Sequence, residues 1–260
     1  MIFTFPEPRH LGISLATLRQ RHPLVHCITN QVASNLTANA LLCVGASPLM
    51  AEDEDEVAAL SPDALLINLG MQTPARMRSA RVAVTGARQR GTPWVLDPVA
   101  AGALSSRTEL ALELAAFRPA VIKGNASEII ALAGGQGGRG TDATSPTSDA
   151  QASAEALARH TGAIITITGP EDIVTDGHRT TIVTHGHPML AKITGLGCMV
   201  GALIAACLTV ETDALLAATN ALTLLGLAAE RAAVRATGPG SLQVELLDEL
   251  YKTGSGVWFS

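Results

Sequence analysis

Short runs of apolar and β-branched residues alternate with helix-length segments along most of this 260-residue chain. The predicted strands are residues 24–29, 47–51, 64–70, 93–97, 120–124, 163–169, 172–176 and 180–184. Between the early strands, helical patterns occupy residues 31–43, 53–60, 74–90 and 106–117. Regular alternation of this kind predicts an α/β fold in which helices cover both faces of a mainly parallel sheet.

The last third of the chain departs from this alternation. The strands predicted at 172–176 and 180–184 are separated by only three residues, Gly177, His178 and Arg179. We therefore expect a hairpin and an antiparallel pair at one edge of the sheet. After Gly197 the pattern is almost wholly helical to about residue 252. No internal repeat or linker is visible, which predicts a single domain over residues 1–260.

Charge, apolar length and cysteine spacing exclude several classes of protein. The formal net charge is −5 and no long basic run is present, so we expect neither nucleic-acid binding nor an electrostatic membrane anchor. The most apolar run, residues 198–210, is shorter than the ~20 residues of a membrane span, and the N-terminus has no signal-peptide pattern. The cysteines, Cys27, Cys43, Cys198 and Cys207, lack CxxC or zinc-ligand spacing. We therefore expect a soluble cytoplasmic protein with reduced thiols.

One glycine motif is misleading. Gly135, Gly137 and Gly140 fit the G-x-G-x-x-G pattern of dinucleotide-binding folds. That pattern requires a preceding strand and a helix that begins within it, whereas here a helical segment precedes it and a polar stretch follows. We interpret residues 134–150 as a loop, and an NAD-binding oxidoreductase is a poor alternative.

Polar residues follow several predicted strands at their carboxyl ends, where open parallel sheets bind ligands. Asp97, Lys123, Asn125 and Thr168 occupy such positions, and Glu128 lies one helical turn beyond Asn125. Each has a purely structural interpretation: a turn before Pro98, a solvated strand end, or a capping box. Taken together they favour phosphoryl transfer, with the two carboxylates for Mg²⁺ and the lysine for phosphate. No Walker motif is present.

The stretch Thr194-Gly195-Leu196-Gly197-Cys198 opens a long apolar helix. Its unpaired N–H groups form a site for an anion such as a transferring phosphoryl group. A helix N-terminus also lowers the pKa of a thiol, so we expect Cys198 to be acidic. Three roles stay open for Cys198: an inert buried thiol, a base or positioning group for an acceptor hydroxyl, and a covalent nucleophile.

Asparagines recur near helical spacing between residues 26 and 57, at Asn30, Asn35 and Asn39. Either Asn30 caps a helix with a polar stripe, or these side chains line a pocket for a heteroaromatic substrate. In the second case Met50 would supply an adaptable apolar contact.

Six stretches resemble the hydroxyethylthiazole kinase family, in order and over about residues 12–252. They are "PLVHCITNQVASNLTANALLCVGASPLMA", "VLDPVAAGA", "IKGNASEI", "TITGPEDIV", "KITGLGCMVGALIAA" and "GPGSLQVELLDELY". The first and fifth are specific to this family, and the others are partly shared across the ribokinase-like superfamily.

The resemblance implies a three-layer α/β/α ribokinase-like fold. It implies transfer of phosphate from ATP to the hydroxyl of 4-methyl-5-(2-hydroxyethyl)thiazole in thiamine salvage, with Mg²⁺, in a homotrimer whose sites lie between subunits. The residues that match the family's motifs are Met50 and Gly195 for substrate, Lys123 and Thr168 for ATP, Asp97 and Glu128 for the metal, Gly195 and Gly197 for the anion hole, and Cys198 as the active-site cysteine.

Two departures from the family and two alternatives remain. The Gly/Ser/Thr-rich insert at 134–150 is looser than the resemblance implies, and its role stays unassigned. The family often has arginine where Lys123 stands, and lysine cannot form a bidentate fork. Related sugar and vitamin kinases have an aspartate base at the Cys198 position. Dehydratases of this fold also have an acidic residue there. The alternatives are a ribokinase-like kinase for another small alcohol, a vitamin precursor or a sugar, and a non-catalytic ligand-binding relative.

Overall fold

The computed structural model describes residues 8–135 and 147–252. Its single sheet has the strand order β2-β1-β3-β4-β5-β6-β7-β8. The strands are β1 (Leu24–Ile28), β2 (Ser47–Leu49), β3 (Ala64–Asn68), β4 (Trp94–Asp97), β5 (Val121–Asn125), β6 (Ile164–Thr168), β7 (Asp172–Thr175) and β8 (Thr180–Val183). Each of the eight predicted strands is found, and the predicted α/β class is confirmed.

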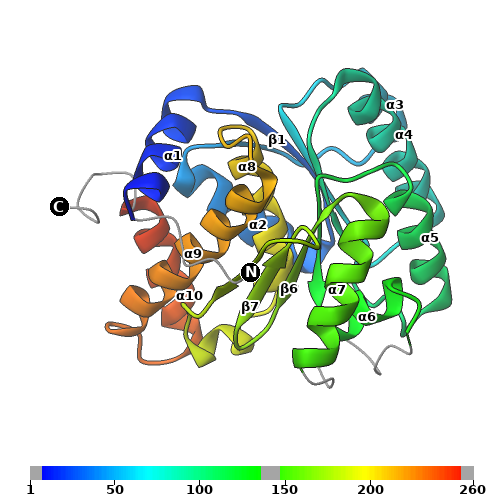
Figure 1. The fold of residues 1–260 in the computed structure, drawn as a ribbon. Helices are drawn as coiled ribbons and strands as arrows, with labels where there is room; N and C mark the ends of the chain where they lie inside the picture. Colours follow the sequence, from blue (N-terminus) through cyan, green and yellow to red (C-terminus); the bar gives the residue numbers. More distant parts are fainter. Residues whose placement is uncertain (1–7, 136–146, 253–260) are drawn as a thin grey trace.

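Helices cover both faces of the sheet and make it the middle of three layers (Figure 1). One layer contains α1 (Pro8–Arg21), α2 (Gln31–Val44), α8 (Leu196–Leu208), α9 (Ala214–Ala233) and α10 (Pro239–Lys252). The other contains α3 (Glu54–Ala59), α4 (Pro74–Arg90), α5 (Ser105–Ala115), α6 (Ala126–Leu132) and α7 (Thr147–Thr161). A short 3₁₀ helix, η1 (Pro188–Lys192), precedes α8.

Two hydrophobic cores lie on the two faces of the sheet, because successive strand residues point to opposite sides. In β3, Leu66 joins the core under α2, α8 and α9, whereas Leu65 and Ile67 join the core under α4, α5 and α7. The central helix α8 is apolar on nearly every side, as expected of a helix enclosed by the sheet and by α2 and α9.

Strands β1 to β6 are parallel, and β7 is antiparallel to both β6 and β8. The predicted hairpin of β7 and β8 is confirmed. The sequence did not predict that β7 also reverses against β6. Only residues 169–171 join these two strands, which is far too short for the crossover that a parallel neighbour requires.

The prediction of a loop over residues 134–150 is partly wrong. The loop predicted at 134–150 ends earlier, because α7 begins at Thr147. Serine, threonine and aspartate are as typical of a helix start as of a loop, so composition alone misplaced the boundary. Gly137 and Gly140 of the G-x-G-x-x-G pattern lie outside the described residues, and α6 rather than a strand precedes Gly135.

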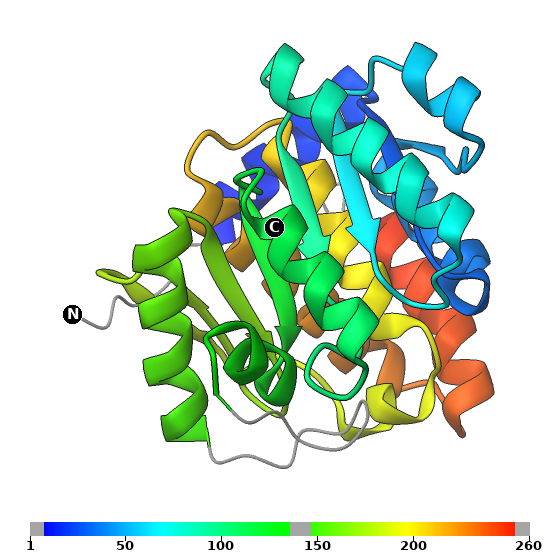
Figure 2. The ribbon, with the colours of Figure 1, turned by 90° about the vertical axis from the view of Figure 1, so that its right-hand side faces the viewer.

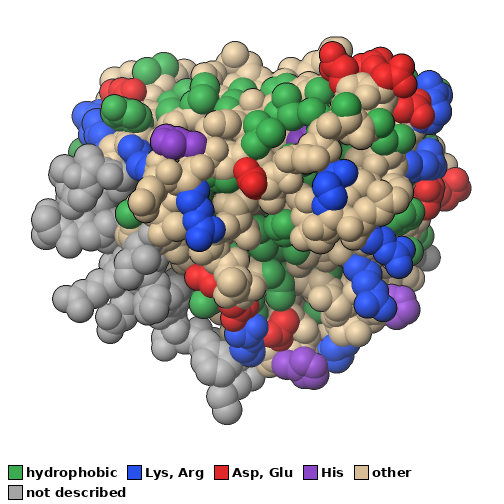
Figure 3. Space-filling view, turned by 90° about the horizontal axis from the view of Figure 1, so that it is seen from above, with side chains coloured by type: hydrophobic (Ala, Val, Ile, Leu, Met, Phe, Trp, Pro, Cys, Tyr) green, Lys and Arg blue, Asp and Glu red, His purple; other side chains and the backbone are tan. Residues whose placement is uncertain are grey.

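The parallel strands point downward in Figure 2, so their carboxyl ends and the start of α8 meet at the lower end of the molecule. Figure 3 shows the opposite end, where apolar side chains alternate with charges of both signs. Within the described ranges, no helix combines the length and the apolar character that crossing a membrane requires.

Candidate active site

Neighbouring parallel strands bring their last residues together at one edge of the sheet. Asn68 ends β3 and lies beside Asp97, which ends β4. Asn30 caps α2 just beyond β1, and its side-chain oxygen accepts a hydrogen bond from the N–H of Ala33 at 3.0 Å. The capping interpretation of Asn30 is therefore confirmed, and the same side chain has a second set of contacts.

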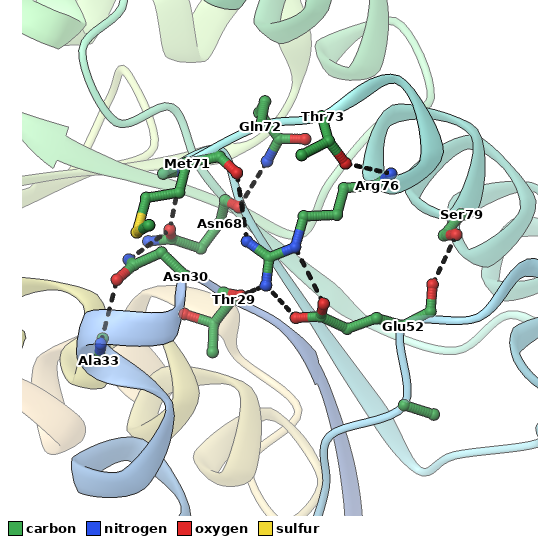
Figure 4. A network of polar contacts seen from close by, with 12 residues as sticks. Thr29, Asn30, Ala33, Glu52, Asn68, Met71, Gln72, Thr73, Arg76 and Ser79 are labelled. Atoms are coloured by element: carbon green, nitrogen blue, oxygen red, sulfur yellow. Dashed lines mark hydrogen bonds and ion pairs between the residues drawn. The ribbon is translucent and has the colours of Figure 1, made fainter.

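A chain of buried amides connects the thiol to the carboxylate. Asn30 Nδ2 lies 3.2 Å from Cys198 Sγ. The same nitrogen donates to Asn68 Oδ1 at 3.0 Å (Figure 4). Asn68 Nδ2 in turn donates to Asp97 Oδ2 at 2.7 Å. Asn68 is wholly buried, and sequence reasoning missed it. The signal was a single polar residue at the end of an apolar strand, two strands away from Asn125.

Lys123 occupies the opposite side of Asp97. Its ammonium donates to Asp97 Oδ2 at 3.0 Å and to the carbonyl of Gly197 at 2.8 Å, so it ties two strands to the first turn of α8. Burial by itself lowers the pKa of Lys123, but the charge of Asp97 and, more weakly, Cys198 and Glu128 raise it overall. Lys123 is therefore a buried cation at this edge and not a solvated strand end.

Burial of Asp97 opposes its ion pair with Lys123, because it disfavours the charged carboxylate. Loss of water raises the pKa of the Asp97 carboxyl, while the charge of Lys123 and the hydrogen bonds from Lys123 and Asn68 lower it. The two groups form a close ion pair, with side-chain exposures of 5% and 0%. The pair is charged at neutral pH, because two donors, Asn68 Nδ2 and Lys123 Nζ, converge on Asp97 Oδ2 and the pKa of the lysine is raised.

Glu128 joins the next loop to this edge. It forms the expected capping box with Asn125, donating its N–H to Asn125 Oδ1 and accepting from Asn125 N–H. Its second oxygen accepts from the N–H of Ala100 at 2.8 Å, which fixes the turn after β4. Burial, and after it the charge of Asp97, raise the pKa of Glu128, so the two carboxyl groups feel each other.

The two carboxyl groups fit a divalent cation. Asp97 Oδ1 is buried and has no hydrogen-bond partner among the described residues. Mg²⁺ uses one or two carboxylates and completes its shell with water and phosphate oxygens, so a larger cluster is not required. No group of three or more His, Cys, Asp or Glu suited to a metal occurs within residues 8–135 and 147–252.

The start of α8 is pressed against the start of α2. Gly195 has a φ of +85°, and a Cβ there would lie 3.0 Å from the Cα of Ala33. Both the backbone conformation and the close approach therefore require glycine. This packing brings two helix N-termini together at Cys198, as expected of an anion site.

The expected acidity of Cys198 is wrong. Burial, and after it the charge of Asp97, raise the pKa of the thiol above its ordinary value, although Lys123 and hydrogen bonds from Asn30 and Asn68 lower it. The loss of water around the sulfur and the charge of Asp97 outweigh the effect of Lys123 and of these hydrogen bonds. Cys198 is therefore mainly a neutral thiol near pH 7.

A cavity of about 670 Å³ opens beside the start of α8. Gly197, Asn125 and Thr168 line it, so the structure brings Thr168 to the same hollow as the anion site. Val200 and Leu225 add an apolar wall. Met50 does not line this cavity. It follows β2, is half-buried and packs against the core that contains α2 and α8.

Asp172 at the start of β7 also lines this cavity, and sequence reasoning missed it. Burial raises the pKa of its carboxyl to about 6, although the N–H of Gly169, at 2.9 Å from Oδ1, and the charge of Lys123 lower it. An ionisable group with this pKa at the cavity wall carries a charge that depends on pH close to neutrality.

The chain has the three-layer α/β/α fold of ribokinase-like proteins, and its sequence contains no Walker motif. The chain matches a model of the hydroxyethylthiazole kinase family over residues 15–255. The chain belongs to that family.

Individual relatives agree with this assignment. A hydroxyethylthiazole kinase of Granulibacter bethesdensis is 52% identical over 246 residues, which cover 94% of this chain and 90% of the relative. One of Escherichia coli K12 is 46% identical, with 92% of each chain covered. The solved structure of a hydroxyethylthiazole kinase protein from Pyrococcus horikoshii OT3 has a TM-score of 0.87 at 42% identity, covering 94% of this chain and 93% of that one.

More distant structures share the fold alone. A pyridoxal kinase of Bacillus subtilis has a TM-score of 0.61 at 15% identity, covering 80% of this chain and 92% of that one. An ADP/ATP-dependent NAD(P)H-hydrate dehydratase of the same organism has a TM-score of 0.62 at 16% identity, with 90% and 91% covered.

The raised pKa of Asp172 gives a pH-dependent stability. The carboxyl titrates near 6 in the folded chain but near 3.8 when unfolded, so its charge destabilises the fold increasingly as the pH rises between these values. Asp172→Asn removes the charge and keeps an oxygen for the N–H of Gly169. We expect its Tm to exceed that of the wild type at about pH 7.5, with the gain shrinking below pH 6 and lost near pH 4.

Differential scanning fluorimetry across this pH range measures the effect. Glu171→Gln is the matched control, because Glu171 is the adjacent carboxyl and is exposed. A gain in Tm that is independent of pH would contradict the assigned titration.

Proposed function

We propose that the chain transfers the γ-phosphoryl group of ATP to the hydroxyl of 4-methyl-5-(2-hydroxyethyl)thiazole, giving the thiazole phosphate and ADP in thiamine salvage. Family membership supports the kinase class and this acceptor. The structural observation that carries the proposal is the convergence of Cys198, Asn30, Asp97 and Lys123 on the first turn of α8.

In this proposal ATP occupies the cavity lined by Thr168 and Gly197, with its terminal phosphate at the start of α8. The N–H groups of that helix start stabilise charge on the transferring phosphoryl group. Lys123 adds a fixed positive charge and holds the carbonyl of Gly197, so it keeps the turn in place as well as attracting phosphate. This supports the nucleotide roles of Lys123 and Thr168.

Mg²⁺ belongs to the proposal, with Asp97 and Glu128 as the residues that would hold it through oxygen atoms or its waters. When bound, such an ion neutralises charge on the phosphates. The buried Asp97 Oδ1 without a partner supports this role. A cytoplasmic location is part of the same proposal, since ATP is the phosphate donor.

Cys198 contacts the acceptor hydroxyl in this proposal and chiefly positions it. A loose phosphoryl-transfer transition state needs little removal of the proton before the bond forms. A neutral thiol held by Asn30 at 3.2 Å suits that role better than a thiolate base would. Met50 and Gly195 belong to the acceptor side of the same site.

ADP release coupled to an indicator tests the function, with ATP, Mg²⁺ and the hydroxyethylthiazole beside a panel of small alcohols. We expect saturable turnover that requires the thiazole. Turnover with another alcohol alone would overturn the acceptor and retain the kinase. Binding of the thiazole by folded protein without turnover on any alcohol would favour a ligand-binding relative.

Substitutions at Cys198 separate positioning from base catalysis. Cys198→Asp places at the same point a carboxylate that is ionised at neutral pH and can accept the hydroxyl proton, so we expect it to keep or raise kcat, whereas Cys198→Ala lowers kcat by about 10-fold or more. Steady-state kinetics with both substrates measures this, and an unchanged Tm provides the control for folding. Equal kcat in wild type and Cys198→Ala would leave the thiol with packing alone.

A homotrimer with sites between subunits completes the proposal. Exposed apolar side chains support it near the acceptor side: Val32, two residues beyond Asn30, is 55% exposed, and Met71 after β3 is 45% exposed. We expect light scattering after size exclusion to give three times the chain mass of 26.8 kDa. A mass of one chain at assay concentration would contradict it.

A further inference from the structure

Arg76, in the first turn of α4, is 7% exposed although it carries a charge. Its Nε donates to Glu52 Oε2 at 2.9 Å, and its Nη2 pairs with the other oxygen of the same carboxylate. Nη2 also donates to the carbonyl of Thr29 at 2.6 Å, and Nη1 points to that of Met71 at 3.4 Å (Figure 4). One guanidinium thus joins the loops that follow β1, β2 and β3.

A neighbouring ion pair shows what this arrangement adds. Arg78 lies in α4 like Arg76, Glu54 begins α3 two residues after Glu52, and Arg78 Nε lies 3.1 Å from Glu54 Oε2. Their side chains are 58% and 46% exposed, and a surface pair of this kind contributes little. Arg76 differs because its planar donor fork is buried and directed at backbone carbonyls as well as at a carboxylate.

The loops that Arg76 joins carry the acceptor side of the site. Thr29 immediately precedes Asn30, the residue in contact with Cys198 Sγ. Glu52 lies two residues after Met50, and its own carbonyl accepts from Ser79 Oγ at 2.7 Å. The segment is held from the other side too, because His26 Nε2 lies 2.8 Å from the carbonyl of Ala51.

The third loop reaches the buried amide chain. Gln72, next to Met71, donates from Nε2 to the carbonyl of Asn68 at 3.1 Å. The cavity on the other side of the site is lined from β5, β6, the loops around β7 and β8, α8 and α9. The hydrogen bonds and the ion pair of Arg76 described above do not involve those elements.

The geometry points to Arg76 and Glu52 as the positioning pair of the acceptor side, which sets Asn30 and Met50 in place relative to Cys198. This inference rests on the proposed function for the identity of the acceptor, but not for the separation of the two sides. The pair acts through the loops and touches neither the phosphate nor the thiol.

The test compares Arg76→Lys and Glu52→Gln with wild type in steady-state kinetics, with each substrate varied in turn. Lysine keeps the charge but loses the fork, and glutamine keeps the shape but loses the charge. We expect the KM for the acceptor to rise about 10-fold or more, because small displacements at a reacting centre have large effects, while the KM for ATP stays within about 2-fold.

Arg78→Lys and Glu54→Gln are the matched controls and should leave both KM values unchanged. A double-mutant cycle compares Arg76→Met, Glu52→Gln and the variant that carries both substitutions. The double variant should raise the KM for the acceptor no more than the larger single effect. Melting temperatures identify any variant that is poorly folded, and for it the milder Arg76→Lys supplies the kinetic comparison.

Equal changes in both KM values, or no change in either, would overturn the positioning role. If wild type does not phosphorylate the thiazole, the proposed function fails, and the same comparison is made with the alcohol of the panel that it does phosphorylate. An acceptor-selective effect there would still support the pair.

Discussion

The buried ion pair of Asp97 and Lys123 is the contact on which the rest of the site depends. Two charges that have lost almost all contact with water are expensive, and they are stable only when the remaining donors and acceptors are also satisfied. Asn68 and the carbonyl of Gly197 provide those partners. Because the pair joins β4, β5 and α8, the fold cannot relax one of these elements without exposing an uncompensated charge in the core.

The same burial decides the chemistry of the neighbouring groups. It raises the pKa of Cys198, so the thiol is neutral, and it raises the pKa of Glu128, which hydrogen bonds from the N–H groups of Ala100 and Asn125 offset in part. A strongly basic thiolate beside Asp97 would repel that carboxylate and the phosphates alike. The site therefore relies on fixed donors and on a glycine-led helix start, Gly195, which is consistent with a reaction whose transition state needs charge stabilisation more than proton removal.

Local sequence patterns predicted the strands and helices, but they did not predict contacts between distant segments. Short apolar and β-branched runs located all eight strands, and strand-end position selected Asp97 and Lys123. Asn68 ends an apolar strand, but its contact with Asp97 follows from the adjacency of β3 and β4, which the chain order does not state. Arg76 looks like an ordinary polar residue of a helix start, and its burial depends on Glu52, 24 positions away. The direction of the thiol pKa required knowing how much water the fold removes.

The proposed site divides into two halves with different supports. In this proposal the acceptor half is built from the loops after β1, β2 and β3, and the phosphate half from β5 to β8 with α9. Few of the described contacts cross between them: the amide chain through Asn68, the Asp97–Lys123 pair, and the packing of Gly195 on α2. Changes of acceptor can therefore accumulate in the first half while the phosphate half stays intact. This division explains how one α/β/α fold supports kinases for different alcohols.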